Sequence, residues 1–270
     1  MDMDINNYTE YNSKMIDDWV NDGWCWGMPI SNEVFVNAQN GEWEVVLTPS
    51  KTVPKKWFVP YYKESEESKL TGVKLLGLAS GGGQQIPIFA ALGADCVILD
   101  YSDKQLESEK LVSEREGYDI NIVKADMTKR LPFGDDSFDL IFHPVSNCYI
   151  EDVCHVWNEC YRVLKPGGVL LAGMDNGINF LFDDDEAYED GKLIAANKLP
   201  VNPLKDPVIY EKFMKNGDGF QFSHTMEDQI GGQLKAGFIL TDLYEDREPD
   251  GLVSQYFPQY ICTRAVKPKT

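Results

Sequence analysis

Basic residues are scarce in this sequence. The 25 lysines and arginines face 44 aspartates and glutamates, which gives a formal net charge of −19 at neutral pH. A surface with that charge repels the phosphate backbone of nucleic acids. We therefore expect no nucleic acid as a main partner, and a mild preference for neutral or cationic small molecules.

Segments typical of membrane, secreted and zinc-binding proteins are also absent. No run approaches the roughly 18 apolar residues of a membrane span, and residues 1–14 are polar and acidic, unlike a signal peptide. The six cysteines form no C-x-x-C pair and only three histidines accompany them, so we expect no metal site. We expect a cytoplasmic protein with reduced thiols that contacts no membrane, either a monomer or a homodimer.

Short apolar runs alternate with amphipathic segments from residue 73 onward. Continuous runs of this length are typical of strands buried on both faces of a parallel sheet, and the segments between them have helical spacing. The alternation predicts an α/β fold with a doubly wound, mostly parallel, seven-stranded Rossmann-like sheet. No helix is expected between the last two strands, which favours an antiparallel C-terminal hairpin. The expected strands are 73–79, 96–100, 120–126, 138–143, 169–174, 238–246 and 256–267.

Two segments depart from this alternation. Residues 1–72 are irregular and rich in tryptophan, and we expect an N-terminal cap there, followed by the main domain at 73–270. Residues 175–225 interrupt the main domain and predict an inserted lid. The tryptophans of the cap can wall a ligand pocket or anchor the cap on the sheet, and we favour anchoring. Trp57, close in sequence to the first strand, is nevertheless expected to contact the ligand.

Three consecutive glycines, Gly81 to Gly83, follow the first expected strand. Ligands of open parallel sheets bind at the carboxyl ends of the strands, so these glycines predict a ligand lying against the backbone. Asp100 ends the second strand 19 residues after Gly81 and is placed to accept the hydroxyls of a ribose. An NAD site needs a further glycine at position 86, which is Ile86, so a smaller nucleoside fits better.

At these residues the sequence resembles a class I S-adenosylmethionine-dependent methyltransferase. The likeness is carried by "LLGLASGGG", "VILDYS", "KADM" and "LPFGDDSFDLIFH", followed by "YRVLKPGGVLLAG". It is strong over residues 73–174 and loose over 226–267, and the whole chain resembles a bacterial subgroup with "ASGGGQQ" and "HPVSN" motifs. The resemblance implies S-adenosylmethionine as the cofactor and a small molecule as the methyl acceptor.

The resemblance also implies a set of cofactor-binding residues. The methionine moiety would lie along the glycine turn, the ribose on Asp100, the adenine amino group on Asp126, and the reactive methyl group near His143. The implied set is Ala79, Ser80, Gly81, Gly83, Gln84, Gln85, Asp100, Tyr101, Ser102, Ala125, Asp126, Met127, His143 and Pro144.

The glycine motif departs from the family pattern at its beginning. Family members usually carry an acid two residues before the first glycine, where this chain has Gly77, and the first glycine itself is Ala79. Another polar group must therefore orient the amine of the cofactor. We expect Gln84 or Gln85 to do this, or a group from the cap.

The loop after the fourth strand is the expected place of the methyl acceptor. His143 is the candidate general base, since an imidazole titrates near neutral pH, although it can equally serve only as a hydrogen-bonding residue. The expected acceptor pocket contains Ser146, Asn147, Tyr149 and Trp57. Three other functions stay open on the sequence alone. They are a non-catalytic nucleoside-binding module, an aminopropyltransferase that uses decarboxylated S-adenosylmethionine, and a nicotinamide-dependent oxidoreductase, which Ile86 and the terminal hairpin disfavour.

Overall fold

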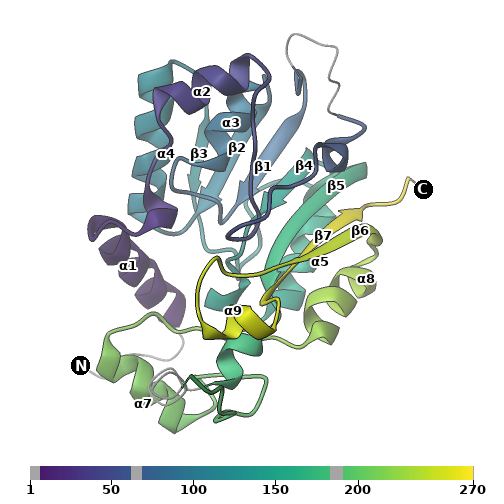
Figure 1. Ribbon diagram of the computed structural model, residues 1–270. Helices are drawn as coiled ribbons and strands as arrows, with labels where there is room; N and C mark the ends of the chain where they lie inside the picture. Colours follow the sequence, from purple (N-terminus) through teal and green to yellow (C-terminus); the bar gives the residue numbers. More distant parts are fainter. Residues whose placement is uncertain (1–6, 62–68, 183–190, 270) are drawn as a thin grey trace.

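The computed structural model describes residues 7–61, 69–182 and 191–269. Its centre is a seven-stranded sheet with the strand order β3-β2-β1-β4-β5-β7-β6 (Figure 1). All pairs are parallel except the two that involve β7, which runs antiparallel to both β5 and β6. The strands are β1 Lys74–Leu78, β2 Asp95–Asp100, β3 Asn121–Lys124, β4 Phe138–His143, β5 Leu164–Asp175, β6 Ile239–Asp246 and β7 Tyr260–Val266.

This sheet confirms the predicted doubly wound fold and its antiparallel C-terminal pair. One detail was wrong, because the connection between β6 and β7 contains a short helix, α9 (Leu252–Tyr256). The sequence "LVSQY" is too short to show helical periodicity, which explains why it was missed.

Helices cover both faces of the sheet. On one face lie α3 (Gln85–Ala91), α4 (Asp103–Glu116) and part of the N-terminal segment, and on the other lie α5 (Val153–Val163) and α8 (Gly232–Ala236). Alternate residues of one strand supply the two cores: Leu75 packs into the first and Leu76 into the second. The continuous apolar runs of the sequence follow from this burial on both faces.

The N-terminal segment contributes α1 (Tyr8–Asn21), α2 (Asn32–Gln39) and the short helices η2 (Cys25–Gly27) and η3 (Lys55–Phe58). Trp43 and Trp57 are buried in the first core, and the indole Nε1 of Trp57 donates to Asp242 Oδ2 at 2.8 Å. These two tryptophans anchor the segment on the sheet.

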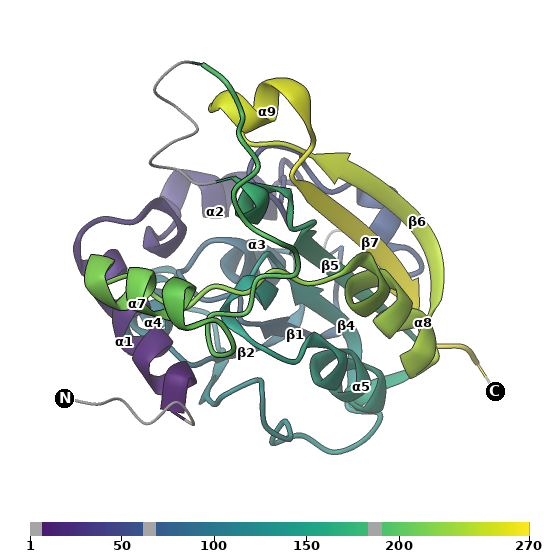
Figure 2. The same cartoon turned by 90° about the horizontal axis from the view of Figure 1, so that it is seen from below.

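The segment between β5 and α8 contains η5 (Ile178–Leu181) and α7 (Pro207–Asn216). Asp206 caps α7 by accepting from Val208 N and Ile209 N, yet no residue of the helix is buried. In Figure 2, the view from below, α7 lies beside α1 and overlaps α4. Asn12 of α1 joins the two segments, because its amide donates to Phe220 O and accepts from Phe220 N.

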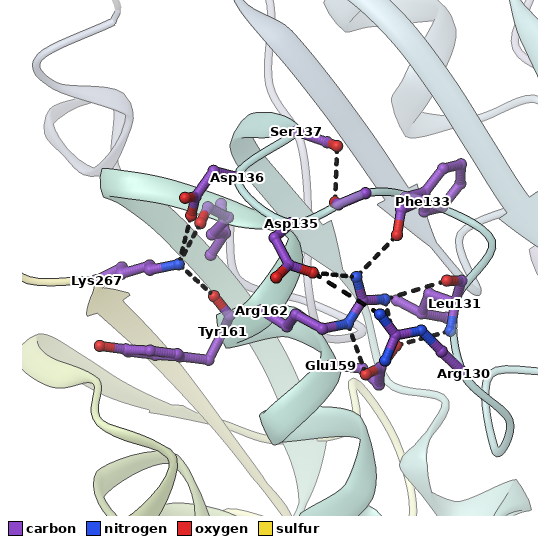
Figure 3. A network of polar contacts seen from close by, with 12 residues as sticks. Arg130, Leu131, Phe133, Asp135, Asp136, Ser137, Glu159, Tyr161, Arg162 and Lys267 are labelled. Carbon is purple, nitrogen blue, oxygen red and sulfur yellow. Dashed lines mark hydrogen bonds and ion pairs between the residues drawn. The ribbon is translucent and has the colours of Figure 1, made fainter.

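The motif "LPFGDDSFDLIFH…YRVLKPGG" builds a polar network at the amino end of β4, away from the carboxyl ends of the strands (Figure 3). The Arg162 guanidinium donates to Glu159, to Asp135 and to the carbonyls of Phe133 and Leu131. Lys267 from the C-terminal end adds bonds to Asp136 and to the Tyr161 and Leu164 carbonyls. This part of the sequence therefore holds in place the loop that leads into β4.

Candidate functional site

A cavity of about 630 Å³ lies at the carboxyl ends of the strands. One side of it, which we call the turn side, is lined by residues of 79–85, 99–105 and 125–127. The other, the lid side, is lined by residues of 146–150, 175–221, 248 and 260. Residues of 9–49, which belong to the N-terminal segment, contribute further lining, including Trp24 and Trp26. The cavity is where an open parallel sheet binds its ligands.

Neighbouring protein atoms leave no room for side chains at Gly81, Gly82 and Gly83. A Cβ atom on Gly81 would lie 2.6 Å from Gln105 Cβ, one on Gly82 would lie 2.4 Å from Trp26 O, and one on Gly83 would lie 2.8 Å from Ser108 O. Gly82 and Gly83 also have φ angles of +99° and +69°, in the region that favours glycine. α4 and the N-terminal segment approach the backbone here and by themselves require glycine at these positions. Gly81 also lines the cavity, so the expected contact between the turn and a ligand stays a prediction.

The unusual beginning of the motif also has a packing reason. A Cβ on Gly77 would lie 2.4 Å from Ile86 Cδ1 and 3.0 Å from Ile98 Cδ1, so an acidic side chain there would have to displace Ile86. Ala79 has a φ of +46°, the left-handed region that its usual glycine would occupy more easily. The chain keeps the backbone shape of the motif, and the side chains of Ile86 and Ile98 occupy the space beside Gly77.

Asp100 fixes the turn through three backbone hydrogen bonds. Its Oδ2 accepts from Gly81 N at 3.0 Å, and its Oδ1 accepts from Tyr101 N at 2.8 Å and Ser102 N at 3.0 Å. Burial raises the pKa of Asp100, while these three donors act in the opposite direction. Oδ2 keeps a second acceptor site toward the cavity that Asp100 lines.

Asp126 follows β3 and lies on the same side of the cavity. Its Oδ1 accepts from Thr128 N at 2.8 Å, and its Oδ2 accepts from Thr9 Oγ1 at 2.8 Å. The bond to Thr9 connects the strand edge to α1. Two carboxylates on neighbouring strands, each oriented by protein donors, can bind the hydroxyl and amino groups of a nucleoside.

The two glutamines after the glycines hold the N-terminal segment. Gln84 Nε2 donates to Cys25 O at 2.6 Å and to Met28 O at 3.1 Å, and Gln85 Oε1 accepts from Val46 N at 3.1 Å. Both line the cavity, but these bonds already use the Gln84 amide donors and one acceptor site of Gln85. Two other groups on the turn side, Ser80 Oγ and Gln105 Oε1, are buried without a hydrogen-bond partner in the described part of the chain.

The structure brings most of the predicted site residues to this cavity. Those that line it are Ala79, Ser80, Gly81, Gln84, Gln85, Asp100, Tyr101, Ser102, Ala125, Asp126, Met127, Pro144, Ser146 and Tyr149. Gly83, His143, Asn147 and Trp57 do not line it. Gly83 lies under the turn, where its N–H donates to Glu109 Oε1 at 2.8 Å. The expectation that Trp57 contacts the ligand fails because its indole is buried in the core on one face of the sheet.

His143 is fully buried behind the cavity wall. Its Nδ1 lies 2.8 Å from Leu78 O and its Nε2 lies 2.8 Å from Asn147 Oδ1, so both ring nitrogens are engaged within the protein. Burial lowers the pKa of His143. Instead of a general base exposed to a substrate, His143 is a residue that joins the end of β1 to the loop after β4.

Sequence reasoning missed three polar groups on the lid side. Asp175 ends β5, Tyr260 pairs with it at the start of β7, and Glu248 lies between β6 and α9. Tyr260 Oη donates to Glu248 Oε1, while Asp175 accepts from Gly177 N and, at 3.4 Å, from Asn179 Nδ2. Burial, with a smaller contribution from the charge of Glu248, raises the pKa of Asp175 to about 7. The position of Asp175 at a strand end was the signal that could have found it.

Residues 7–61, 69–182 and 191–269 contain no group of three or more His, Cys, Asp or Glu side chains that could hold a metal ion. Nor does any helix in them have the length and apolar character needed to cross a membrane.

Comparison with known proteins agrees with this geometry. A family model for a methyltransferase domain matches residues 76–172. The uncharacterized methyltransferase YbaJ of Bacillus subtilis (strain 168) is 42% identical over 266 residues, which cover 97% of this chain and 100% of that protein. The chain belongs to the methyltransferase family. This membership removes the nicotinamide-dependent oxidoreductase from consideration.

More distant relatives share only part of this methyltransferase. A sterol 24-C-methyltransferase of Aspergillus fumigatus is 36% identical over 101 residues, which cover 36% of this chain and 26% of that protein. Among solved structures, an S-adenosylmethionine-dependent methyltransferase from Mesorhizobium loti aligns with a TM-score of 0.54 and 20% identity, covering 73% of this chain and 91% of that one. One from Methanosarcina mazei aligns with a TM-score of 0.52 and 15% identity, covering 73% and 93%. At such identities these structures show the shared fold.

Proposed function

We propose that this methyltransferase transfers a methyl group from S-adenosylmethionine to a small molecule that binds on the lid side of the cavity. The observation that carries the proposal is the single cavity that joins the two carboxylates of the turn side, Asp100 and Asp126, to the polar groups of the lid side. When bound, S-adenosylmethionine supplies an activated methyl group on a positively charged sulfur. The protein has to align the acceptor with this group and exclude water.

The residues on the turn side fit this cofactor. Asp100 and Asp126 offer acceptor sites for a ribose and an adenine amino group. Trp24 and Trp26 of the N-terminal segment also line the cavity. Six charged side chains line the cavity. Lys212 is the one basic side chain among them, and the five acidic ones are Asp100, Asp126, Asp175, Asp218 and Glu248.

This charge favours a neutral or cationic acceptor over an anionic one. Asp175 is the group placed to take a proton from the acceptor, because it lines the lid side, and burial holds its pKa at about 7. The charged or titratable groups around it are Glu248, Tyr260 and Cys148. An acceptor with an ionisable N–H or O–H group makes use of such a carboxylate, whereas a hydrocarbon does not.

The acceptor is found by incubating the protein with methyl-labelled S-adenosylmethionine and pools of amines, alcohols and carboxylic acids. We expect label transfer to members of the amine or alcohol pools and none to the carboxylic acids. Binding of S-adenosylhomocysteine without any label transfer would favour the non-catalytic nucleoside-binding module. A nucleoside product from decarboxylated S-adenosylmethionine with an aminopropylated acceptor would favour the aminopropyltransferase, for which Asp175 and Glu248 supply acids that the "HPVSN" loop lacks.

The role of Asp175 predicts the pH dependence of turnover. The rate should rise as the pH increases through about 7, since the carboxylate is the active form. Asp175→Asn should lower the turnover number about 100-fold or more and leave S-adenosylhomocysteine affinity unchanged. Glu248→Gln should move the midpoint of the profile to lower pH, because the charge of Glu248 raises the pKa of Asp175. A midpoint that stays in place in Glu248→Gln would contradict this role.

A further inference from the structure

Helix α1 contacts both sides of the cavity. Its lining residues are spaced three and four positions apart, which places them on one face of the helix: Thr9, Asn12, Ser13 and Ile16. The chemistry of methyl transfer assigns no task to this helix, although it borders the space for both ligands. Its hydrogen bonds show what it joins.

Three polar side chains attach α1 to the turn side. They are spaced four residues apart along the helix, at Thr9, Ser13 and Asp17. Thr9 Oγ1 donates to Asp126 Oδ2 at 2.8 Å, and Ser13 Oγ donates to Tyr101 O at 2.7 Å. Asp17 Oδ1 accepts from Ser102 Oγ at 2.5 Å. The helix therefore rests on the residues that follow β2 and β3, where the cofactor is expected.

Asn12 attaches the same helix to the lid side. Its side chain is buried, and the residue is only 3% exposed. Nδ2 donates to Tyr149 O at 3.1 Å and to Phe220 O at 2.9 Å, and Oδ1 accepts from Phe220 N at 2.7 Å. Both N–H donors of the amide are used in this way. Asn12 thus joins α1 to two segments that lie 137 and 208 residues away in the chain.

The fully buried ring of Phe220 extends this connection to α7. Its centroid lies 5.4 Å from that of Tyr11 in α1. On α7 it lies 5.1 Å from the ring centroid of Tyr210 and 6.0 Å from that of Phe213, which lines the cavity. Figure 2 shows the two helices side by side. Since α7 contains no buried residue, little free energy opposes its opening, and the contacts of Phe220 bear on that equilibrium.

We propose that α1 couples the two sides of the cavity, so that the lid side is held closed most firmly when the cofactor is bound. A cofactor on the turn side gains contacts with Thr9, Ser13 and Ile16 only while α1 is docked, so its binding favours the docked helix. The docked helix holds Phe220 and, through it, α7. This inference rests on the proposed function, because the ligand that favours docking is S-adenosylmethionine. Asn12 and Tyr11 are positioning residues, and the order of binding that follows is cofactor first and acceptor second.

Hydrogen–deuterium exchange of the full chain tests the coupling, with and without saturating S-adenosylhomocysteine. In wild type the ligand should slow exchange of the α7 amides about 5-fold or more. In Asn12→Ala and in Tyr11→Ala the slowing should shrink to less than about twofold, because the connection to Phe220 is weakened. Tyr11 does not line the cavity, so Tyr11→Ala leaves the contacts of the cofactor in place. Reciprocity requires its affinity for S-adenosylhomocysteine to fall by no more than the slowing that is lost.

A matched control is Lys14→Ala. Lys14 also lies on α1, but its side chain is 70% exposed and pairs with Glu10 of the same helix, so the wild-type slowing should be kept. If Asn12→Ala and Tyr11→Ala speed exchange of α7 equally with and without ligand, the two residues only stabilise the fold and the proposal is overturned. Wild type that binds S-adenosylhomocysteine without any slowing in α7 would overturn this inference alone. Wild type that does not bind the ligand would overturn the proposed function as well.

Discussion

Glycines on the two sides of the cavity have very different surroundings. On the turn side, a Cβ on Gly82 would lie within 3 Å of both Trp26 O and Gln105 Oε1. On the lid side, Gly217 ends α7 with a similar positive φ of +71°, yet a Cβ there would meet nothing within 4 Å. The turn side is packed from two directions by α4 and the N-terminal segment, whereas α7 contains no buried residue.

The tighter packing of the turn side and the looser packing of the lid side suit the cofactor and the methyl acceptor, respectively. The cofactor is the same in every turnover, so a rigid site that needs no reorganisation favours its binding. The acceptor must enter and its product must leave, and the elements that open for this come from the less stable parts of a protein. We therefore expect changes on the turn side to affect folding and cofactor affinity, and changes at exposed positions of α7 to affect only the acceptor.

The largest effect is expected for Gly82→Ala. The substitution combines a φ of +99° with a contact of 2.4 Å to a backbone oxygen, and should lower the free energy of unfolding by about 3–5 kcal/mol. Gly217→Ala is the control, since it meets only the unfavourable φ and should cost about 1 kcal/mol. Urea unfolding of both variants measures the difference. Equal losses would mean that the turn is not packed as described.

The next effect concerns Glu109, which is fully buried under the turn. Its Oε1 accepts from Gly83 N, its Oε2 has no partner in the described residues, and burial raises its pKa to about 8. The folded state therefore keeps a proton that the unfolded state releases, so stability falls as the pH rises from about 5 to about 8. Glu109→Gln keeps an acceptor for Gly83 N and removes the charge.

Glu109→Gln should be more stable than wild type by about 2–4 kcal/mol at pH 9, with a smaller difference at pH 5. Denaturant unfolding across this pH range measures both curves. Glu114→Gln, on the same helix but with a side chain 68% exposed, serves as the control and should follow wild type. Parallel curves for wild type and Glu109→Gln would contradict a buried, proton-binding carboxyl under the turn.

The smallest effect is expected in α7. Val208 lines the cavity but is 78% exposed, so Val208→Ser should change the free energy of unfolding by no more than about 0.5 kcal/mol. If acceptors lie against this helix, the Michaelis constant for the acceptor should rise a few-fold, while S-adenosylhomocysteine affinity stays the same. A large loss of cofactor affinity in Val208→Ser would contradict a cofactor that lies only on the turn side.

The sequence predicted the turn side better than the lid side for a physical reason. Asp100 and Asp126 follow strands whose apolar runs are visible in one dimension, and parallel strands bring their carboxyl ends together. Asp175, Glu248 and the residues of α7 meet through packing between segments far apart in the chain, which no local pattern records.

His143 shows the same limit. His143 follows an apolar strand directly and was expected in the cavity, yet its side chain is buried and its two nitrogens bond within the protein. The reason for the three glycines likewise became clear only once Trp26, Gln105 and Ser108 were located.

We propose that Asp100 at the glycine turn binds the ribose of S-adenosylmethionine. Calorimetric titration of wild type and of Asp100→Asn with S-adenosylhomocysteine tests this role. Asn keeps one oxygen, which can still accept from Tyr101 N and Ser102 N, but it loses the charge and the second oxygen that accepts from Gly81 N, so binding should weaken about 10- to 100-fold while the thermal unfolding transition stays cooperative. A wild-type protein that binds S-adenosylhomocysteine with an affinity unchanged by Asp100→Asn, or does not bind it at all, would contradict the claim.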